Sequence, residues 1–193
     1  FKKGIFLFFF FIVFFYQKTY YSFSVNLNNL NCSEYNCSIN IKNNDVLENV
    51  NSLVGAKYSL FRLYNSEDNQ QIPIFYFITS EITEPLSFSG KPIELLIGID
   101  KFCIIRDIKL LKHSEPIILL GIPLTELLSS VLSYKNKSFK DSITLGNTTA
   151  SNINKIDVIS RATVTSIGLH TTILDSVIKV ASDLQFLNKN VNS

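Results

Sequence analysis

Two apolar stretches that follow each other almost without a break constrain the fold of this chain most strongly. The first, PIELLIGID, covers residues 92–100, and the second, CIIRDIKLL, covers residues 103–111, with only Lys101 and Phe102 between them. Both are rich in the branched apolar residues that strands favour. The pair therefore predicts a β-hairpin in which residues 93–99 lie against residues 103–111 and the chain turns at Asp100 and its neighbours.

Strand and helix patterns surround this hairpin in a simple order. The segment IPIFYFIT, residues 72–79, predicts a strand in which Pro73 stands at the start or at a sheet edge. A helix is predicted from Pro123 onward, because apolar residues then recur at helical spacing up to Leu132. Residues 145–154 have the composition of a loop, and a last helix is predicted over residues 167–187. Its apolar stripe consists of Ile173, Leu174, Val177, Ile178, Ala181 and Leu184.

Strands that are followed by helices, without βαβ alternation, indicate the α+β class. The chain has 193 residues and 46% hydrophobic content, which is enough for the core of one domain. We expect a small, mainly antiparallel sheet packed against helices, formed by residues 46–187 and followed by a short tail at residues 188–193.

The beginning of the chain has the pattern of an export segment. Lys2 and Lys3 precede an uninterrupted apolar run, IFLFFFFIVFFY, over residues 5–16. A basic flank before a run of this length is typical of a signal peptide, whereas a membrane anchor needs about 20 apolar residues and would extend toward Tyr20 and Tyr21. A buried core helix is disfavoured because the run has no polar face. We therefore expect residues 1–24 to be a signal peptide or a membrane anchor, and the Asn-rich residues 25–45 to be a linker.

Composition excludes several classes of function. The 18 basic and 16 acidic residues are not gathered into blocks, so the chain lacks the basic surface that nucleic-acid binding requires. There is neither a glycine-rich phosphate loop nor a cysteine pattern typical of a metal site. Cys32 and Cys37 could pair in an oxidising compartment or remain free, and Cys103 lies in an apolar stretch that predicts a buried thiol. His113 and His170 lack a nearby nucleophile motif, which argues against hydrolase chemistry.

The segment DVISRATVTS, residues 157–166, places four hydroxyl residues before the predicted last helix: Ser160, Thr163, Thr165 and Ser166. The backbone N–H groups of a helix N-terminus, together with such hydroxyls, can form an anion site. Ordinary N-capping by one of the hydroxyls explains the same pattern, and local physics alone favours capping.

This segment resembles the covalent flavin-attachment motif of the FMN-binding domain. That motif reads Asp, two variable residues, Ser or Thr, Gly, Ala, Thr, one variable residue, and then the acceptor Thr. The chain departs from it at Arg161, where the family has glycine. Two further stretches, FSGKPIELLIGID at residues 88–100 and HSEPIILLGIP at residues 113–123, are similar to the periplasmic domain of the NosR and NirI proteins. The resemblance covers residues 46–187 in the same order. The matching motif residues are Asp157, Ser160, Ala162, Thr163 and Thr165.

The resemblance implies that a flavin transferase joins the phosphate of FMN to the Thr165 hydroxyl as a phosphoester. It also implies that the other residues of the segment surround the cofactor, with Asp157 serving transferase recognition or loop orientation rather than phosphate binding. Arg161 can be interpreted in two ways. The family glycine supplies a positive φ, which an arginine tolerates poorly, or the backbone is ordinary there and the guanidinium pairs with the phosphate. The remaining cofactor-site candidates in the segment are Ser160, Ala162, Thr163 and Ser166.

The stretch at residues 113–123 supplies candidates for the flavin pocket. His113 and Glu115 precede a proline, which favours an extended loop, so a turn-stabilising role and a pocket or partner contact both remain open. The junction formed by Gly121, Ile122 and Pro123 is expected close to the isoalloxazine ring. His170, in the predicted last helix, is expected to be a helix-face residue rather than a proton donor.

The function that the resemblance implies is electron transfer by a bound flavin rather than stand-alone enzyme activity. We expect a flavoprotein domain on the periplasmic side of the inner membrane that passes electrons to nitrous oxide reductase in denitrification, or supports that reductase's maturation proteins. In the family the flavin domain is followed by membrane helices and iron–sulfur clusters, so we expect this chain to be a fragment, a truncated product or part of a split system. Two alternatives stay open: the flavin subunit of an Rnf- or Nqr-type ion-translocating complex, and a flavin-free assembly module.

Overall fold

The computed structural model describes residues 41–42, 44–84, 87–140, 143–146 and 155–187. The predicted export segment, the predicted tail, Cys32 and Cys37 lie outside these ranges, as does the predicted linker up to residue 40. Among the described residues, no helix combines the length and the apolar character that crossing a membrane requires.

The centre of the molecule is a five-stranded antiparallel sheet whose strand order follows the chain. The predicted hairpin is confirmed, because its two strands pair with Leu95 opposite Leu110 and Ile97 opposite Ile108. The predicted strand at residues 72–79 is also present, and Pro73 stands just before its first residue. The five strands are β1 (Asp45–Asn49), β2 (Leu60–Asn65), β3 (Ile74–Ile78), β4 (Glu94–Ile99) and β5 (Ile105–Lys112).

The first two strands of the sheet were not predicted as strands. β1 and β2 are short, and their apolar residues are interrupted by polar and charged ones, so neither shows the alternation typical of a half-buried strand. Contacts between the two strands, rather than a local sequence pattern, accompany their pairing. Glu48 and Arg62 occupy paired positions and form an ion pair with an N–O distance of 2.6 Å.

The helices follow the predicted order, with different ends for the last one. α4 begins four residues before the predicted Ile167 and ends before the predicted Leu187, so Thr165 and Ser166 lie inside its first turns. The sequence favoured a later start because threonine and serine disfavour helix interiors.

Leu145, predicted as the start of a loop, belongs to a short parallel pair formed by β6 (Thr144–Leu145) and β7 (Lys155–Ile156). The helical elements are α2 (Asn51–Val54), the 3₁₀ turn η3 (Thr79–Glu81), α3 (Leu124–Leu132) and α4 (Thr163–Asp183).

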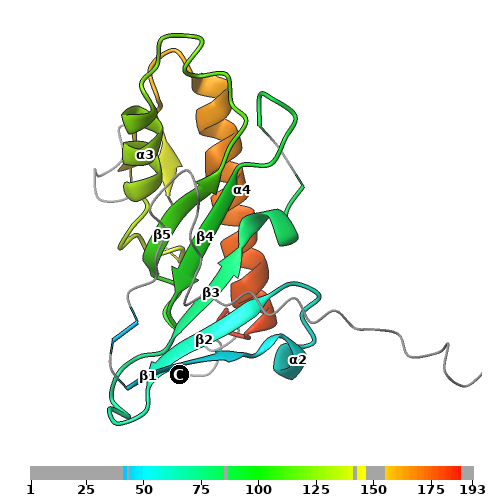
Figure 1. Ribbon diagram of the computed structural model, residues 1–193, viewed down its shortest axis with the longest axis vertical. Helices are drawn as coiled ribbons and strands as arrows, with labels where there is room; N and C mark the ends of the chain where they lie inside the picture. The colour runs from blue at the N-terminus through cyan, green and yellow to red at the C-terminus, as the bar shows by residue number, and fades with distance from the viewer. Residues whose placement is uncertain (1–40, 43, 85–86, 141–142, 147–154, 188–193) are drawn as a thin grey trace, which may run out of the picture.

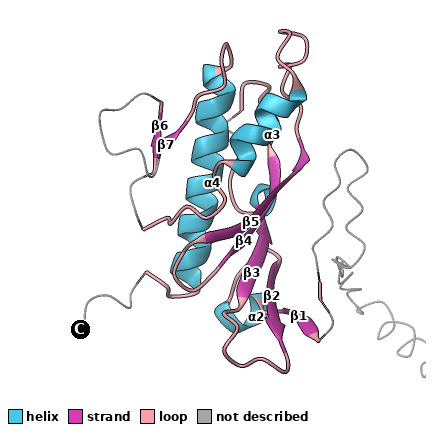
Figure 2. Cartoon of the chain, turned by 90° about the vertical axis from the view of Figure 1, so that its left-hand side faces the viewer, coloured by secondary structure: helices cyan, strands magenta, loops and turns pink. Residues whose placement is uncertain are grey.

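The core lies between the sheet and the helices, and both views show α4 lying along one face of the sheet (Figures 1 and 2). This arrangement confirms the predicted α+β class. Cys103 is fully buried within the core, as predicted. The predicted stripe of α4 is wrong at Ile178, which is 41% exposed, because the helix turns Leu169 and Val180 toward the sheet instead. The core side chains of α4 are Leu169, Ile173, Val177, Val180 and Ala181.

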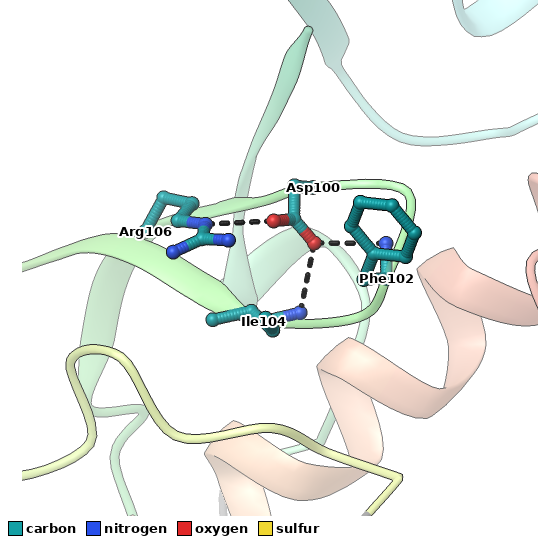
Figure 3. Close-up of polar contacts among 4 residues, drawn as sticks. All are labelled: Asp100, Phe102, Ile104 and Arg106. Atoms are coloured by element: carbon teal, nitrogen blue, oxygen red, sulfur yellow. Dashed lines mark hydrogen bonds and ion pairs between the residues drawn. The ribbon is translucent and has the colours of Figure 1, made fainter. Parts of the chain in front are cut away.

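A buried aspartate closes the predicted hairpin. The Asp100 carboxylate is 1% exposed and accepts hydrogen bonds from the backbone N–H groups of Phe102 and Ile104, at 2.8 and 3.1 Å. Its second oxygen pairs with Nε of Arg106 at 2.6 Å (Figure 3). Cys103, within the same turn, has a positive φ of 62°. One carboxylate thus satisfies two backbone donors that the turn would otherwise leave unpaired.

Candidate functional site

Three segments that are far apart in the sequence meet at the beginning of α4. β5 leads into the loop of residues 113–123 at the same end of the molecule as the start of α4 (Figure 1). Glu115, in this loop, accepts a hydrogen bond from the Thr165 hydroxyl and another from the backbone N–H of Ser89. The stretches at residues 88–100, 113–123 and 157–166, which carried the family resemblance, are therefore joined by the two oxygens of one carboxylate.

The contact between Thr165 and Glu115 is short and buried. Oγ1 of Thr165 lies 2.6 Å from Oε2 of Glu115, and the two residues are 4% and 5% exposed. Burial by itself would raise the pKa of the Glu115 carboxyl. Hydrogen bonds from Thr165 and Ser89 outweigh burial and hold that pKa below its ordinary value. The carboxylate is therefore charged at neutral pH.

The two loops that carry Glu115 and Ser89 are each braced locally. Nδ1 of His113 accepts a hydrogen bond of 3.2 Å from the backbone N–H of Glu115, which supports a turn-stabilising role for this histidine. The Ser87 hydroxyl bonds the Lys91 carbonyl oxygen and the Ser89 hydroxyl, so the loop before β4 is closed on itself. These contacts fix the Ser89 N–H in the direction of Glu115.

The hydroxyls near the start of α4 do not cap it. Its N-cap residue is Ala162, and no side chain makes a capping hydrogen bond, so the N-capping interpretation is wrong. Ser166 is buried, donates to the Ala162 carbonyl oxygen and accepts from the Ile159 N–H, each at 2.9 Å. Its hydroxyl fastens the preceding loop to the helix. The first turn consequently presents backbone N–H groups that no side chain of the described residues caps.

Arg161 occupies the left-handed region of backbone conformation, with φ of 63°. The interpretation that its backbone is ordinary is therefore wrong, and the family glycine stands where a positive φ is required. The side chain is exposed and borders the same cavity as Thr165. Pairing of its guanidinium with a phosphate remains a prediction.

A cavity of about 280 Å³ opens beside Thr165. Most of its wall is apolar, and Phe88, Leu120 and Val164 contribute exposed side chains of 61%, 54% and 53%. Gly121, Ile122 and Pro123, predicted near the flavin ring, do not line this cavity. Ile122 is buried in the core instead, and Pro116, Ile117 and Leu120, which precede it in the chain, line the cavity. The lining residues are Phe88, Pro116, Ile117, Leu120, Arg161, Ala162, Thr163, Val164 and Thr165.

Two residues of the attachment motif face elsewhere. Asp157 and Ser160 line a separate, more polar cavity of about 380 Å³ with serines of α3. The Asp157 side chain is 89% exposed and pairs with Nζ of Lys155 at 3.3 Å. This position fits loop orientation or recognition by another protein better than contact with a phosphate at Thr165.

Sequence reasoning missed two residues of the site and one contact that α4 makes with the chain just after α3. Ser89 and Phe88 belong to the stretch FSGKP, which was informative only through the family resemblance. His170 is half-buried, and its Nδ1 shares a hydrogen bond of 2.8 Å with the Tyr134 hydroxyl. Burial lowers the pKa of His170, so the ring is held neutral against the core, in keeping with the predicted helix-face role.

The residues around Thr165 suit a flavin mononucleotide. An anionic phosphate ester at Oγ1 would face the uncapped N-terminus of α4, where the helix dipole favours negative charge. The exposed Arg161 side chain borders the same space and offers a positive charge. A flat aromatic ring would find apolar walls in Phe88, Leu120 and Val164.

Replacing Arg161 by glycine tests the backbone requirement directly. The left-handed conformation destabilises the folded state by roughly 1–2 kcal/mol when the residue is not glycine. Glycine removes this cost, but its greater conformational freedom in the unfolded chain costs about 0.5–1 kcal/mol of stability. We therefore expect Arg161→Gly to raise the free energy of unfolding by about 0.5–1 kcal/mol. Urea denaturation followed by circular dichroism measures this change. Arg161→Ala, which keeps a Cβ, serves as the matched control and should bring no such gain.

Comparison with known proteins agrees with this geometry. A model of the FMN-binding domain family matches residues 89–177, a range that includes Ser89, Glu115 and Thr165. The regulatory protein NosR of Pseudomonas aeruginosa is 29% identical over 135 residues, which cover 70% of this chain and 18% of that protein. The regulatory protein NosR of Stutzerimonas stutzeri is 28% identical over 110 residues, covering 57% of this chain and 15% of that protein. The chain thus spans less than a fifth of the length of these relatives. FMN is the cofactor of the matched domain, and residues 89–177 form an FMN-binding domain of the type found in NosR regulatory proteins.

Proposed function

We propose that this domain carries FMN covalently, through a phosphoester on Thr165, and works as an electron-transfer domain outside the cytoplasm. The observation that supports the covalent bond most directly is the position of the Thr165 hydroxyl. It occupies the acceptor position of the family motif and borders an apolar cavity. It also donates a hydrogen bond to a buried carboxylate.

When bound, the flavin supplies redox chemistry, and the protein supplies its position and surroundings. The first turn of α4 and Arg161 would hold the phosphate. Phe88, Leu120 and Val164 would cover part of the ring and exclude water from it. A cavity of about 280 Å³ with exposed rims leaves part of a ring uncovered, which suits transfer of electrons to a partner rather than enclosed catalysis on a substrate.

The likeness to NosR regulatory proteins supports a role in nitrous oxide respiration. We propose that the domain passes electrons to nitrous oxide reductase or supports the maturation proteins of that reductase. In this proposal residues 1–24 direct the domain to the periplasmic side of the inner membrane, and a flavin transferase attaches the FMN there. Similarity to NosR in three stretches of sequence favours this system over an ion-translocating complex.

The attachment is tested by producing the full 193-residue chain together with a bacterial flavin transferase. After denaturing electrophoresis, we expect a band at the mass of the chain that fluoresces yellow under ultraviolet light, because a covalent flavin survives denaturation. Omission of the transferase should leave the band dark. A second acceptor protein in the same cells shows that the transferase is active. A dark band under those conditions would contradict covalent attachment and favour a flavin-free assembly module.

A further inference from the structure

We propose that Glu115 is the base, supplied by this chain itself, that accepts the proton of the Thr165 hydroxyl when the flavin phosphate is attached. The inference rests on the proposed attachment at Thr165. A nucleophilic hydroxyl needs a base within hydrogen-bond reach of its proton. Oε2 of Glu115 lies 2.6 Å from Oγ1 of Thr165, and no other acceptor of this hydroxyl is recorded among the described residues.

The Thr165 hydroxyl donates its hydrogen bond outside its own helix. Serine and threonine hydroxyls inside helices commonly donate to the backbone carbonyl four residues earlier. In α4, Ser166 donates to Ala162 and Thr171 donates to Ile167 in this manner, at 2.9 and 3.0 Å. Thr165 instead donates across the structure to a residue 50 positions away. The fold therefore directs this hydroxyl toward the carboxylate rather than toward its own helix.

The charge on Glu115 has no counter-ion among the described residues. In the described part of the chain Glu115 forms no salt bridge, and its oxygens accept hydrogen bonds from Thr165 and from Ser89 and Ser87 in the loop before β4. These hydrogen bonds, rather than an ion pair, keep the carboxylate charged and therefore able to take up a proton.

The chemical step balances with one co-substrate, a flavin dinucleotide that contains a pyrophosphate. A bond forms between Oγ1 of Thr165 and the flavin-side phosphorus, and the pyrophosphate P–O bond on the other side of that phosphorus breaks. The leaving group is a nucleoside monophosphate. The proton of Oγ1 passes to Oε2 of Glu115, and no electrons are gained or lost by the flavin. In the product, a protonated Glu115 avoids a second negative charge beside the new phosphodiester.

The test compares the rate of flavin attachment between wild type and Glu115→Gln, using the full chain, purified transferase and flavin adenine dinucleotide. Attachment is measured by gel fluorescence and by intact mass. We expect the turnover number of the transferase on the variant to fall about 100-fold, with little change in the KM for the acceptor chain, because glutamine keeps the shape but cannot take a proton. Glu84→Gln makes the same chemical change at an exposed carboxylate that does not line the cavity beside Thr165, and it should leave the rate unchanged.

A pH series separates a base from a merely structural contact. Without Glu115, the proton must leave to hydroxide or water, so the ratio of wild-type to variant rates should shrink as the pH rises from about 6 to 9. The transferase's own pH dependence cancels in this ratio. His113, which contacts the Glu115 backbone, and Arg161, which borders the Thr165 cavity, are present in both proteins.

The outcomes are distinguishable. A variant that is labelled within about threefold of the wild-type rate, or a rate ratio that does not change with pH, overturns the role of Glu115 while the attachment itself stands. A wild-type chain that stays unlabelled overturns the attachment, and the role of Glu115 with it. If Glu115→Gln fails to fold, Glu115→Ala takes its place, because alanine also removes the proton acceptor. Full activity of a folded Glu115→Ala, with unchanged pH dependence, overturns the proposal.

Discussion

The largest effect is expected for Thr165→Val, which should abolish covalent flavin entirely. Valine has nearly the shape of threonine but offers no oxygen for a phosphoester, so no fluorescent band should remain after denaturation. Removing the hydroxyl also leaves Oε2 of Glu115 without its donor, and an unsatisfied buried acceptor costs roughly 1–3 kcal/mol of stability. The measurements are in-gel fluorescence, intact mass and thermal unfolding of the unlabelled protein.

Thr163→Val is the matched control. Thr163 lies in the same helical turn and borders the same cavity, but its side chain is exposed and is not bonded to Glu115. We expect this variant to retain its label, because it keeps both the Thr165 hydroxyl and the hydrogen bond from that hydroxyl to Glu115. A trypsin digest gives an independent answer, because cleavage after Arg161 and Lys179 releases residues 162–179 as one peptide, and fragmentation places the added mass on one residue. Loss of label in Thr163→Val with retention in Thr165→Val would show that Thr163, and not Thr165, is the acceptor.

The second large effect concerns stability at the opposite end of β5. Asp100→Ala removes the carboxylate that accepts from Phe102, Ile104 and Arg106 (Figure 3). Two backbone N–H groups then lose their partner, and Arg106 loses its ion pair. Because the Arg106 side chain is 37% exposed, water partly replaces that pair. We expect the free energy of unfolding to fall by roughly 2–4 kcal/mol, measured by urea denaturation.

Asp175→Ala is the comparison for this change. Asp175 is exposed on α4, and its replacement by alanine should alter the free energy of unfolding by no more than about 0.5 kcal/mol. Asp100→Asn keeps one carbonyl oxygen for the backbone donors but gives up the charge, so its effect should lie between the other two. Equal stability of Asp100→Ala and wild type would show that the turn does not depend on the carboxylate.

The hairpin and the last helix could be predicted from the sequence because their own residues carry the signal. Branched apolar residues fill β4 and β5, and an apolar stripe runs along α4, whatever lies next to them. β1 and β2 carry no such signal. Their pairing is stabilised by partners on the neighbouring strand, such as Glu48 with Arg62, and a local pattern does not report a partner 14 residues away.

The start of α4 shows the limit of local rules more sharply. Threonine and serine before an apolar stripe predict N-caps, yet Ser166 and Thr165 lie inside the helix and make other bonds. Ser166 is bonded to the loop that precedes the helix, and Thr165 to the loop that follows β5. The helix therefore begins four residues earlier than predicted. Hydroxyls that are hydrogen-bonded to other loops no longer compete for the N–H groups of the helix.

The sequence by itself determined the fold class and the central hairpin, and it singled out Thr165 as the proposed acceptor, since periodicity and motif spacing are properties of consecutive residues. Only the tertiary structure decided what faces the Thr165 hydroxyl. Glu115 lies 50 residues from Thr165 in the chain, and the positive φ of Arg161 arises from the turn that leads into α4. Distances between remote loops depend on how the sheet and α4 pack against each other, and packing of the whole domain is what brought a buried carboxylate to a single hydroxyl.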